Sequence, residues 1–232
     1  MKNTRTVTSF FDKEYLDYAR YVVENRAIPS CIDGLKPTQR KVVYIANKIW
    51  KTGNEKPMKL FQLAGRVAAE AFYHHGNTSL ESSMVGMAQK FKNSLPLLEG
   101  IGQFGSLRSP AAGAPRYISA KLHPNFRLLY QDFDLLENKI EEGEKIEPAF
   151  FLPIVPTVIL NGTSGIAVGF ATNILNRNPK DVIDACISTL NNKSIKVLAP
   201  WIEEFKGTFT RDLENPKTWK ITGQYQIINT TT

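Results

Sequence analysis

The chain has 232 residues, 42% of them hydrophobic, and a formal net charge of +7. A chain of this length forms one large domain or two small ones, and this hydrophobic content excludes an intrinsically disordered protein. No apolar run approaches the roughly 20 residues that a membrane-spanning helix needs, so we expect no membrane partner.

The positive charge is concentrated in the first half of the chain. Residues 1–127 hold 19 Lys and Arg against 9 Asp and Glu, a net of +10, whereas residues 128–232 hold 10 against 13, a net of −3. A basic half of this kind suits a polyanion, because neutralised phosphates release their counterions. A solvated basic surface that only keeps the protein soluble is the alternative.

The amino terminus and the cysteines indicate the compartment. Residues 1–5 are polar and basic and no apolar segment follows them, so we expect no secretory signal. Cys31 and Cys186 lie far apart and show no metal-ligand spacing. They are predicted to be buried thiols in a reducing compartment, and we therefore expect a cytoplasmic protein.

The first third of the chain predicts three helices. Apolar residues at helical spacing indicate a helix over residues 11–25, which the segment 26–29 ends. Residues 33–37 form a turn that places a proline at the first position of a second helix, which continues to about residue 51. An Ala- and Leu-rich segment predicts the third helix over residues 58–73.

A tight turn at residues 74–77 separates the third helix from a fourth, which continues to about residue 91. Thr78 followed by Glu81 is a capping-box pattern and predicts the start of that fourth helix. Two helices joined by such a turn form a helix-turn-helix, whose second helix enters the major groove with its amino end first. That end offers Asn77, Thr78 and Ser79 for phosphate and backbone contacts. An ordinary αα-hairpin is the alternative.

Glycine and proline punctuate residues 95–122, which predicts two short strands joined by a loop, the wing of a winged helix. Residues 123–150 form an acidic segment, and residues 151–175 are predicted to form a buried strand with an Asn-Gly turn. A helix is predicted over residues 179–190 and further strands over residues 204–227. The predicted fold class is therefore α+β.

The predicted wing carries a tyrosine beside an arginine. Arg116 and Tyr117 follow the glycine-rich segment 102–108. A phenol is a poor nucleophile at neutral pH because its pKa is about 10, but a neighbouring guanidinium favours the phenolate and can bind a phosphate with two hydrogen bonds. The pair is therefore suited to attack a nucleic-acid phosphate. A packed tyrosine beside a solvated arginine is the alternative.

Several segments, in order along the chain, carry a resemblance to one family. They lie at residues 26–29, 33–40, 73–76, 87–89, 102–105, 111–117, 153–156 and 161–173. In these segments the chain resembles the DNA breakage-rejoining part of type IIA DNA topoisomerases, which is found in the A protein of gyrase, in the second half of the eukaryotic enzyme and in the medium subunit of phage enzymes. The resemblance covers about residues 10–228. The adjacent histidines at 74 and 75 favour the phage, viral and eukaryotic types, and a phage-encoded protein would work in the host cytoplasm.

The resemblance implies a set of catalytic and DNA-binding residues. It implies that Tyr117 forms a 5′-phosphotyrosyl bond with DNA, and that Arg116 and Arg26 bind the attacked phosphate. His74 matches the histidine that contacts this phosphate, and Ile166 matches the isoleucine that wedges between base pairs and bends the DNA. The other expected DNA contacts, from the resemblance or from the helix-turn-helix, are Lys36, Arg40, His75, Thr78 and Ser79. Adjacent histidines at a helix end also serve as caps, and too few ligands surround them for zinc.

The resemblance also divides the chain at residue 122. Residues 1–122 would be a winged-helix DNA-cleavage domain, and residues 123–232 the first part of a tower domain, ending before the coiled coil and the dimer gate. The family uses Mg²⁺ held by the acidic cluster of a Toprim domain, and ATP held by an ATPase domain. The sequence has no GxxxxGK[ST] pattern, and Asp132 and Asp134 lack the further Glu of such a cluster. We therefore expect no metal ligand in this chain, with Mg²⁺ and ATP bound by a Toprim/ATPase partner.

The implied activity is double-strand DNA breakage and rejoining in DNA replication, by an ATP-dependent enzyme that passes one duplex through another. The implied assembly is a homodimer or heterotetramer on double-stranded DNA. A non-catalytic winged-helix scaffold that only binds DNA is the alternative from another functional class. A tyrosine recombinase is disfavoured, because the matched positions do not give its Arg-His-Arg arrangement.

Overall fold

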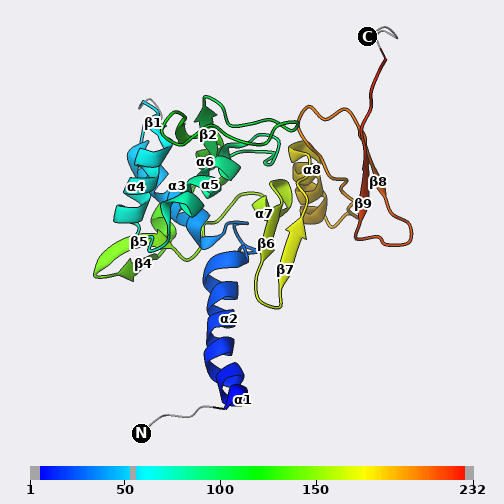
Figure 1. The fold of residues 1–232 in the computed structure, drawn as a ribbon. Coiled ribbons are helices and arrows are strands. Elements are labelled where there is room, and N and C mark those ends of the chain that lie inside the picture. Colours follow the sequence, from blue (N-terminus) through cyan, green and yellow to red (C-terminus); the bar gives the residue numbers. More distant parts are fainter. Residues whose placement is uncertain (1–5, 53–55, 228–232) are drawn as a thin grey trace.

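The computed structural model describes residues 6–52 and 56–227, and the predictions made on residues 1–5 and on residue 228 lie outside this part. Figure 1 shows an amino-terminal helical segment that projects from a body of helices and small sheets. The segment consists of α1 Val7–Phe10, η1 Phe11–Tyr15, α2 Leu16–Val22 and η2 Val23–Ala27, where η1 and η2 are π-helical turns. The helix predicted over residues 11–25 is confirmed and extends further at both ends.

α3, Pro37–Ile49, begins where the sequence predicts it. Pro37 occupies the first helical position, where a missing N–H leaves no hydrogen bond unmade. The Gln39 side chain accepts a hydrogen bond from the Lys36 backbone N–H at 2.9 Å. One face of α3 is fully buried in the core and presents Val42, Val43, Ile45 and Ala46.

α4, Leu60–Glu70, and α5, Asn77–Ala88, pack against each other and against α3, as the helix-turn-helix prediction requires. The predicted capping box is wrong. The N-cap is Gly76, which no side chain caps, so Thr78 already lies inside the first turn. The reason is the extended backbone of Gly76, with φ −63° and ψ 139°, which ends the preceding turn before Thr78. α5 also ends earlier than residue 91, because Gln89 is extended.

β1 Met58–Lys59, β2 Leu98–Ile101 and β3 Ser119–Leu122 form an antiparallel sheet in the order β1–β3–β2. β2 and β3 pair along their whole length, from Leu98 opposite Leu122 to Ile101 opposite Ser119. The two predicted strands and their connection are confirmed, and we call the connection, residues 102–118, the wing loop. β1 lies where the sequence predicts the start of a helix, and the winged-helix interpretation rests on this sheet beside α3, α4 and α5.

The core continues beyond residue 122. The elements that follow are α6 Pro124–Leu129, η3 Phe133–Leu135, β4 Asn138–Glu141 and β5 Glu144–Pro148. Phe126, Tyr130, Phe133 and Phe151 pack with ring centroids 5.2 to 5.7 Å apart. The buried members of this cluster belong to the same core as the buried residues of α3, α4 and α5. The domain boundary at residue 122 stays a prediction.

The buried strand predicted within residues 151–175 is wrong. Its first part forms the short helix α7, Thr157–Leu160, preceded by Pro156, which has no N–H for a strand ladder and serves as the N-cap. Its second part is a largely exposed hairpin of β6 Thr163–Ile166 and β7 Ala171–Ile174. The Asn-Gly pair does not form the hairpin turn, because Asn161 is the C-cap of α7, and its side chain exchanges hydrogen bonds with the Leu95 backbone at 2.8 and 2.9 Å. The hairpin turns at residues 167–170 instead.

The carboxy-terminal elements are α8 Pro179–Leu190, β8 Thr208–Arg211 and β9 Trp219–Thr222, as the sequence predicts. Both cysteines are free, but the prediction of buried thiols is wrong, since Cys186 is half-buried and Cys31 is exposed. Cys31 is exposed because it sits in the tight turn that the Gly34 N–H closes on the Ser30 carbonyl at 2.8 Å. None of the helices in the described part of the chain is long and apolar enough to cross a membrane.

Candidate nucleic-acid interface

A groove of about 1030 Å³ lies between the end of the amino-terminal helical segment, α5 and the β6–β7 hairpin. Its cationic side chains are Arg26, Lys36 and Lys92. Among the described residues that line it, the one carboxylate is Asp33, which is fully buried. The groove therefore presents cations without an exposed carboxylate, which suits a phosphate backbone.

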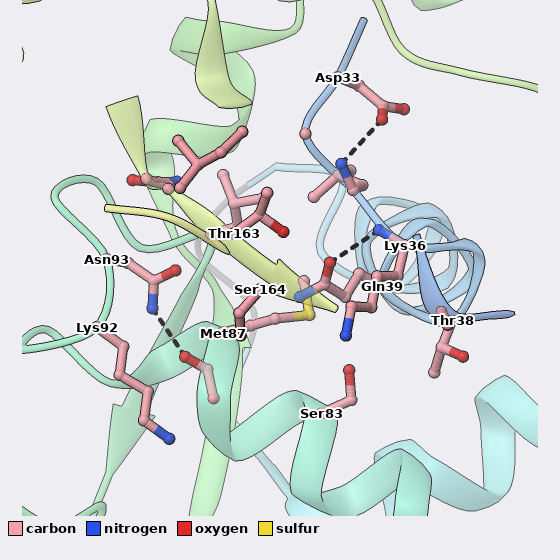
Figure 2. Close-up of a pocket in the computed structure, with 18 of the residues that line it drawn as sticks. Asp33, Lys36, Thr38, Gln39, Ser83, Met87, Lys92, Asn93, Thr163 and Ser164 are labelled. Atoms are coloured by element: carbon pink, nitrogen blue, oxygen red, sulfur yellow. Dashed lines mark hydrogen bonds between the residues drawn. The ribbon is translucent and has the colours of Figure 1, made fainter. Parts of the chain in front are cut away.

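Hydroxyl side chains line the walls between these cations. Ser79, Ser82 and Ser83 share one face of α5, because residues three and four apart lie on the same side of a helix. Figure 2 shows Thr38, Ser83 and Ser164 around this space, each from a different element. Hydroxyls of this kind make many of the phosphate contacts that hold proteins in register on DNA.

Lys36 is partly buried where the preceding loop enters α3. Burial lowers the pKa of the Lys36 ammonium below its ordinary value, because a low dielectric disfavours the charged form. A phosphate in the groove would oppose this effect, since a nearby opposite charge favours the charged form. A polyanion bound in the groove would therefore favour the charged form of Lys36, and the charged ammonium would in turn favour binding of the polyanion.

The two adjacent histidines face different surroundings. His75 lines the groove together with Arg26 and Ser79, and its ring meets the Tyr73 ring at an angle of 73° with centroids 5.2 Å apart. His74 is exposed outside the lining, and its Nε2 lies 3.5 Å from Glu141 Oε1 on β4. The structure thus brings the predicted DNA contacts Arg26, Lys36, His75, Ser79 and Ile166 to one groove. It leaves His74 and Thr78 outside the groove lining.

Arg40 is the predicted DNA contact that the structure contradicts. Its side chain is only 3% exposed. Its Nε and Nη2 donate to the two carboxylate oxygens of Asp33 at 2.8 and 3.0 Å, and Nη2 also donates to the Leu35 carbonyl at 3.1 Å. These buried bonds occupy the fork that a phosphate would need, so Arg40 is a structural residue.

The Asp33–Arg40 pair joins two distant segments. Asp33 also accepts a hydrogen bond from the Phe151 backbone N–H at 3.0 Å, and its carbonyl accepts one from the Thr157 hydroxyl at 2.7 Å. The next residue, Gly34, has φ +68°, and a Cβ there would lie 2.8 Å from the Val158 backbone nitrogen. Glycine is required at this position by conformation and by space. This buried pair fixes the loop that presents Lys36 to the groove.

Tyr117 lies on the wing loop, away from the groove lining. Its side chain is among the exposed large side chains, at 69%. The Arg116 guanidinium carbon lies 5.0 Å from the centroid of the Tyr117 ring, so the predicted pair is in contact. The Tyr117 N–H donates to the Ala114 carbonyl at 2.8 Å, which makes residues 114–117 a tight turn that projects the phenol.

Comparison with known proteins matches these features to one family. The sequence profile of the family formed by the A proteins of DNA gyrase and topoisomerase IV matches residues 26–232. The chain is 43% identical over 230 residues to the DNA topoisomerase medium subunit of Enterobacteria phage T4, and 40% identical over 235 residues to DNA topoisomerase 2 of Arabidopsis thaliana. Each match covers 98% of this chain.

The chain belongs to this DNA gyrase/topoisomerase IV family. It also resembles the crystal structure of the Plasmodium falciparum topoisomerase II DNA-binding, cleavage and re-ligation domain, with a TM-score of 0.83 and 36% identity over 95% of this chain and 30% of that one. The chain spans 49% of the phage protein's length and 16% of the plant enzyme's length. Its matched region is therefore a part of each of these relatives.

Two basic residues of this family member are not among the sequence-predicted contacts. Lys59 Nζ donates to the Tyr117 carbonyl at 2.8 Å, so a cation from β1 holds the backbone of the tyrosine. Lys92 follows α5 and lines the groove. The sequence does not reveal Lys59, because its short strand lies within the segment that is predicted to be a helix. It does not reveal Lys92 either, because the position of Lys92 depends on the residue at which α5 ends.

The acidic residues of the described part do not form a metal site. No group of three or more His, Cys, Asp or Glu side chains within residues 6–52 and 56–227 could hold a metal ion. We therefore assign no metal ligand within the described part of the chain.

Proposed function

We propose that this chain is the DNA-cleaving part of a type IIA DNA topoisomerase and that Tyr117 is its nucleophile. The observation that carries the proposal is an exposed phenol, on a tight turn, in contact with the Arg116 guanidinium. Family membership adds support, because the matched Plasmodium structure is titled as a cleavage and re-ligation domain.

The proposed reaction is an in-line transfer of a DNA phosphoryl group. The Tyr117 phenol oxygen bonds to phosphorus, the bond from phosphorus to the 3′ oxygen breaks, and the phenolic proton is balanced by protonation of that 3′ oxygen. The products are a 5′-phosphotyrosyl linkage and a 3′ hydroxyl, and the reverse step rejoins the strand without ATP. Arg116 is placed to bind the phosphate while charge develops on it, where positioned cations contribute most.

The groove is proposed to hold the duplex on either side of the cleaved bond. Arg26, Lys36 and His75 would neutralise phosphates, and the serines of α5 would hydrogen-bond to the backbone. Ile166 is 87% exposed at the end of β6, which suits an apolar wedge between base pairs. Such a wedge unstacks bases at a cost of a few kcal/mol and gains a bent duplex that contacts more protein.

The whole enzyme is proposed to contain a Toprim/ATPase partner that holds Mg²⁺ and ATP, as the resemblance to type IIA topoisomerases implies. In the proposed assembly, a homodimer or heterotetramer, two copies of Tyr117 cut the two strands of one duplex so that another duplex can pass. We propose that it acts in DNA replication in the cytoplasm, of the host cell if a phage encodes it. His74, whose Nε2 lies 3.5 Å from Glu141 Oε1, is proposed to contact the attacked phosphate, as the resemblance implies.

The test combines this chain with a Toprim/ATPase partner, Mg²⁺ and supercoiled DNA, followed by detergent trapping. We expect a covalent DNA–protein adduct with the wild-type chain and no adduct with Tyr117→Phe, because only the phenol oxygen can bond to phosphorus. An adduct in Tyr117→Phe would overturn the nucleophile assignment. Salt-sensitive binding by the wild-type chain without any adduct would favour the scaffold alternative.

Tyr225→Phe provides the matched control. Tyr225 is 90% exposed, more than Tyr117, but its neighbours in the sequence are glutamines. We expect this variant to form the adduct at the wild-type rate, since exposure alone does not activate a phenol.

A further inference from the structure

Gln89 lies at the C-terminal end of α5, 2% exposed, and bonds to the wing loop. Its Nε2 donates to the Phe104 carbonyl at 2.8 Å and to the Pro110 carbonyl at 3.0 Å. We propose that Gln89 is a positioning residue that sets the place of Tyr117 through the wing loop, an inference that rests on the proposed function.

The polarity of the Gln89 amide is fixed by the loop. Both N–H groups of Nε2 are used, whereas Oε1 is buried and has no hydrogen-bond partner among the described residues. A reversed amide would direct its oxygen at two carbonyl oxygens, which cannot donate. The Gln89 side chain thus makes two hydrogen bonds to backbone carbonyls and leaves its buried Oε1 without a partner in the described part of the chain. Proteins rarely leave a buried polar atom unpaired without a structural or functional reason.

The two carbonyls lie on opposite limbs of the wing loop. Between them the chain reverses, with the Ser106 N–H donating to the Ser109 carbonyl at 2.8 Å. Gly105 has φ +82°, and a Cβ there would lie 2.6 Å from the Pro110 carbonyl oxygen. A glycine at this position therefore lets both limbs come close enough to share one amide.

The downstream limb leads directly to the tyrosine. The Gly113 N–H donates to the Gln103 carbonyl at 2.8 Å, which closes the loop, and the turn at residues 114–117 follows at once. On its other side this turn is held by the start of α4, where the Phe61 N–H donates to the Pro115 carbonyl at 3.4 Å. Tyr117 is therefore held on one side by Lys59 and the start of α4, and on the other side, through the wing loop, by Gln89.

This arrangement connects the groove to the tyrosine through one helix. α5 presents Ser79, Ser82 and Ser83 to the groove and ends at the residue that holds the wing loop. A duplex that binds to these serines therefore contacts α5, the helix whose C-terminal end positions Tyr117 through the wing loop. Displacing a reacting group by about 1 Å costs on the order of 10²-fold in rate, so loss of this anchor should reduce cleavage strongly.

The deciding variant is Gln89→Met, which keeps the length of the side chain and removes both donors. We expect its cleavage rate constant at saturating DNA, measured as adduct formation with the partner and Mg²⁺, to fall at least about tenfold. Its Kd for an uncleaved duplex should stay within about twofold of wild type, because Gln89 does not line the groove. Wild-type cleavage, or equal losses of affinity and cleavage, would overturn the positioning role.

A second measurement does not depend on catalysis. In the free chain, hydrogen exchange at the Ser106 and Gly113 amides should accelerate in Gln89→Met and less in Gln89→Asn, which keeps a shorter amide. Asn125→Leu should leave this exchange unaltered, since the Asn125 amide bonds to the Pro96 carbonyl before β2. Unchanged exchange in Gln89→Met refutes the inference even if wild type cleaves DNA. Accelerated exchange together with a wild-type chain that forms no adduct would instead refute the proposed function.

Discussion

Two basic side chains that lie four residues apart, Arg40 and Lys36, have opposite surroundings. Arg40 is buried against Asp33, with every hydrogen bond directed inward. Lys36, four residues earlier, enters the groove with its ammonium free of any carboxylate partner among the described residues. The same run of sequence thus supplies a cation that holds the fold and a cation that lines an open groove.

The difference lies in what compensates the charge. The Asp33 carboxylate is desolvated and needs the bidentate guanidinium, so the pair is a unit whose loss leaves an uncompensated buried charge. The groove cations are compensated by water and, in the proposed function, by phosphates. The buried pair should therefore govern stability, and the groove cations should govern affinity and its salt dependence.

The largest expected effect comes from breaking the buried pair. Arg40→Leu should lower the free energy of unfolding by about 3–5 kcal/mol, because Asp33 is left charged in the core. Denaturant unfolding measures this loss. Arg40→Lys is a milder variant for a chain that the first substitution unfolds, since a single ammonium replaces only part of the fork.

The contrary outcome is specific. If Arg40→Leu keeps wild-type stability but weakens duplex binding and lowers its salt slope, Arg40 contacts a phosphate and the distinction between Arg40 and the groove cations fails. The matched comparison is Lys36→Gln, whose stability should stay within about 0.5 kcal/mol of wild type, as expected for a side chain without a buried partner.

A smaller effect is expected at the groove. Lys36→Gln should weaken duplex binding about uniformly across DNA sequences and reduce the slope of log K against log salt by about 1, because one phosphate contact is lost. Titration of a labelled duplex at several salt concentrations measures both quantities. Lys196→Gln removes an exposed charge that does not line the groove and should leave the slope unchanged. An unaltered slope in Lys36→Gln would place the DNA elsewhere.

The sequence predicts the main helices and the β2–β3 pair because local signals agree there. Pro37 starts α3, and Gly102 directly follows β2, so no distant contact is needed to locate these element ends. Family resemblance supplies the candidate residues, and the groove then gathers Arg26, Lys36 and Ile166 from three separate segments.

The failures have tertiary causes. Arg40 resembles any basic residue of a DNA-binding protein in the sequence, and only the structure shows that it is paired with Asp33, whose carboxylate also accepts a hydrogen bond from the Phe151 N–H. The apolar run at residues 157–160 has the composition of a strand, but Pro156 and the contacts of Asn161 turn it into a helix. The role of Gln89 depends on the carbonyls of a loop that lies 15 and 21 residues further along the chain, and no local pattern reveals such a bond.

The smallest expected effect tests whether partly buried groups outside the groove also control stability. His123 Nδ1 accepts a hydrogen bond from the Asn125 N–H at 3.1 Å and so caps α6. Burial lowers the pKa of His123, with Glu99 opposing this effect and Lys90 and Lys121 adding to it. Because the pKa is lower in the folded chain, this stabilisation is present above the unfolded value of about 6.5 and is lost as the pH falls below it.

Unfolding of the wild-type chain and of His123→Asn between pH 8 and pH 5 measures this effect. Asparagine also caps helices but does not titrate, so the advantage of wild type over His123→Asn should shrink as the pH falls. The change should be below about 1 kcal/mol, since a cap contributes about that much and solvent screens this partly exposed imidazole. A constant difference at every pH would mean that His123 stabilises α6 by packing alone, and a difference that grows at low pH would contradict the lowered pKa. Duplex affinity at fixed pH should be the same in both chains, because His123 does not line the groove.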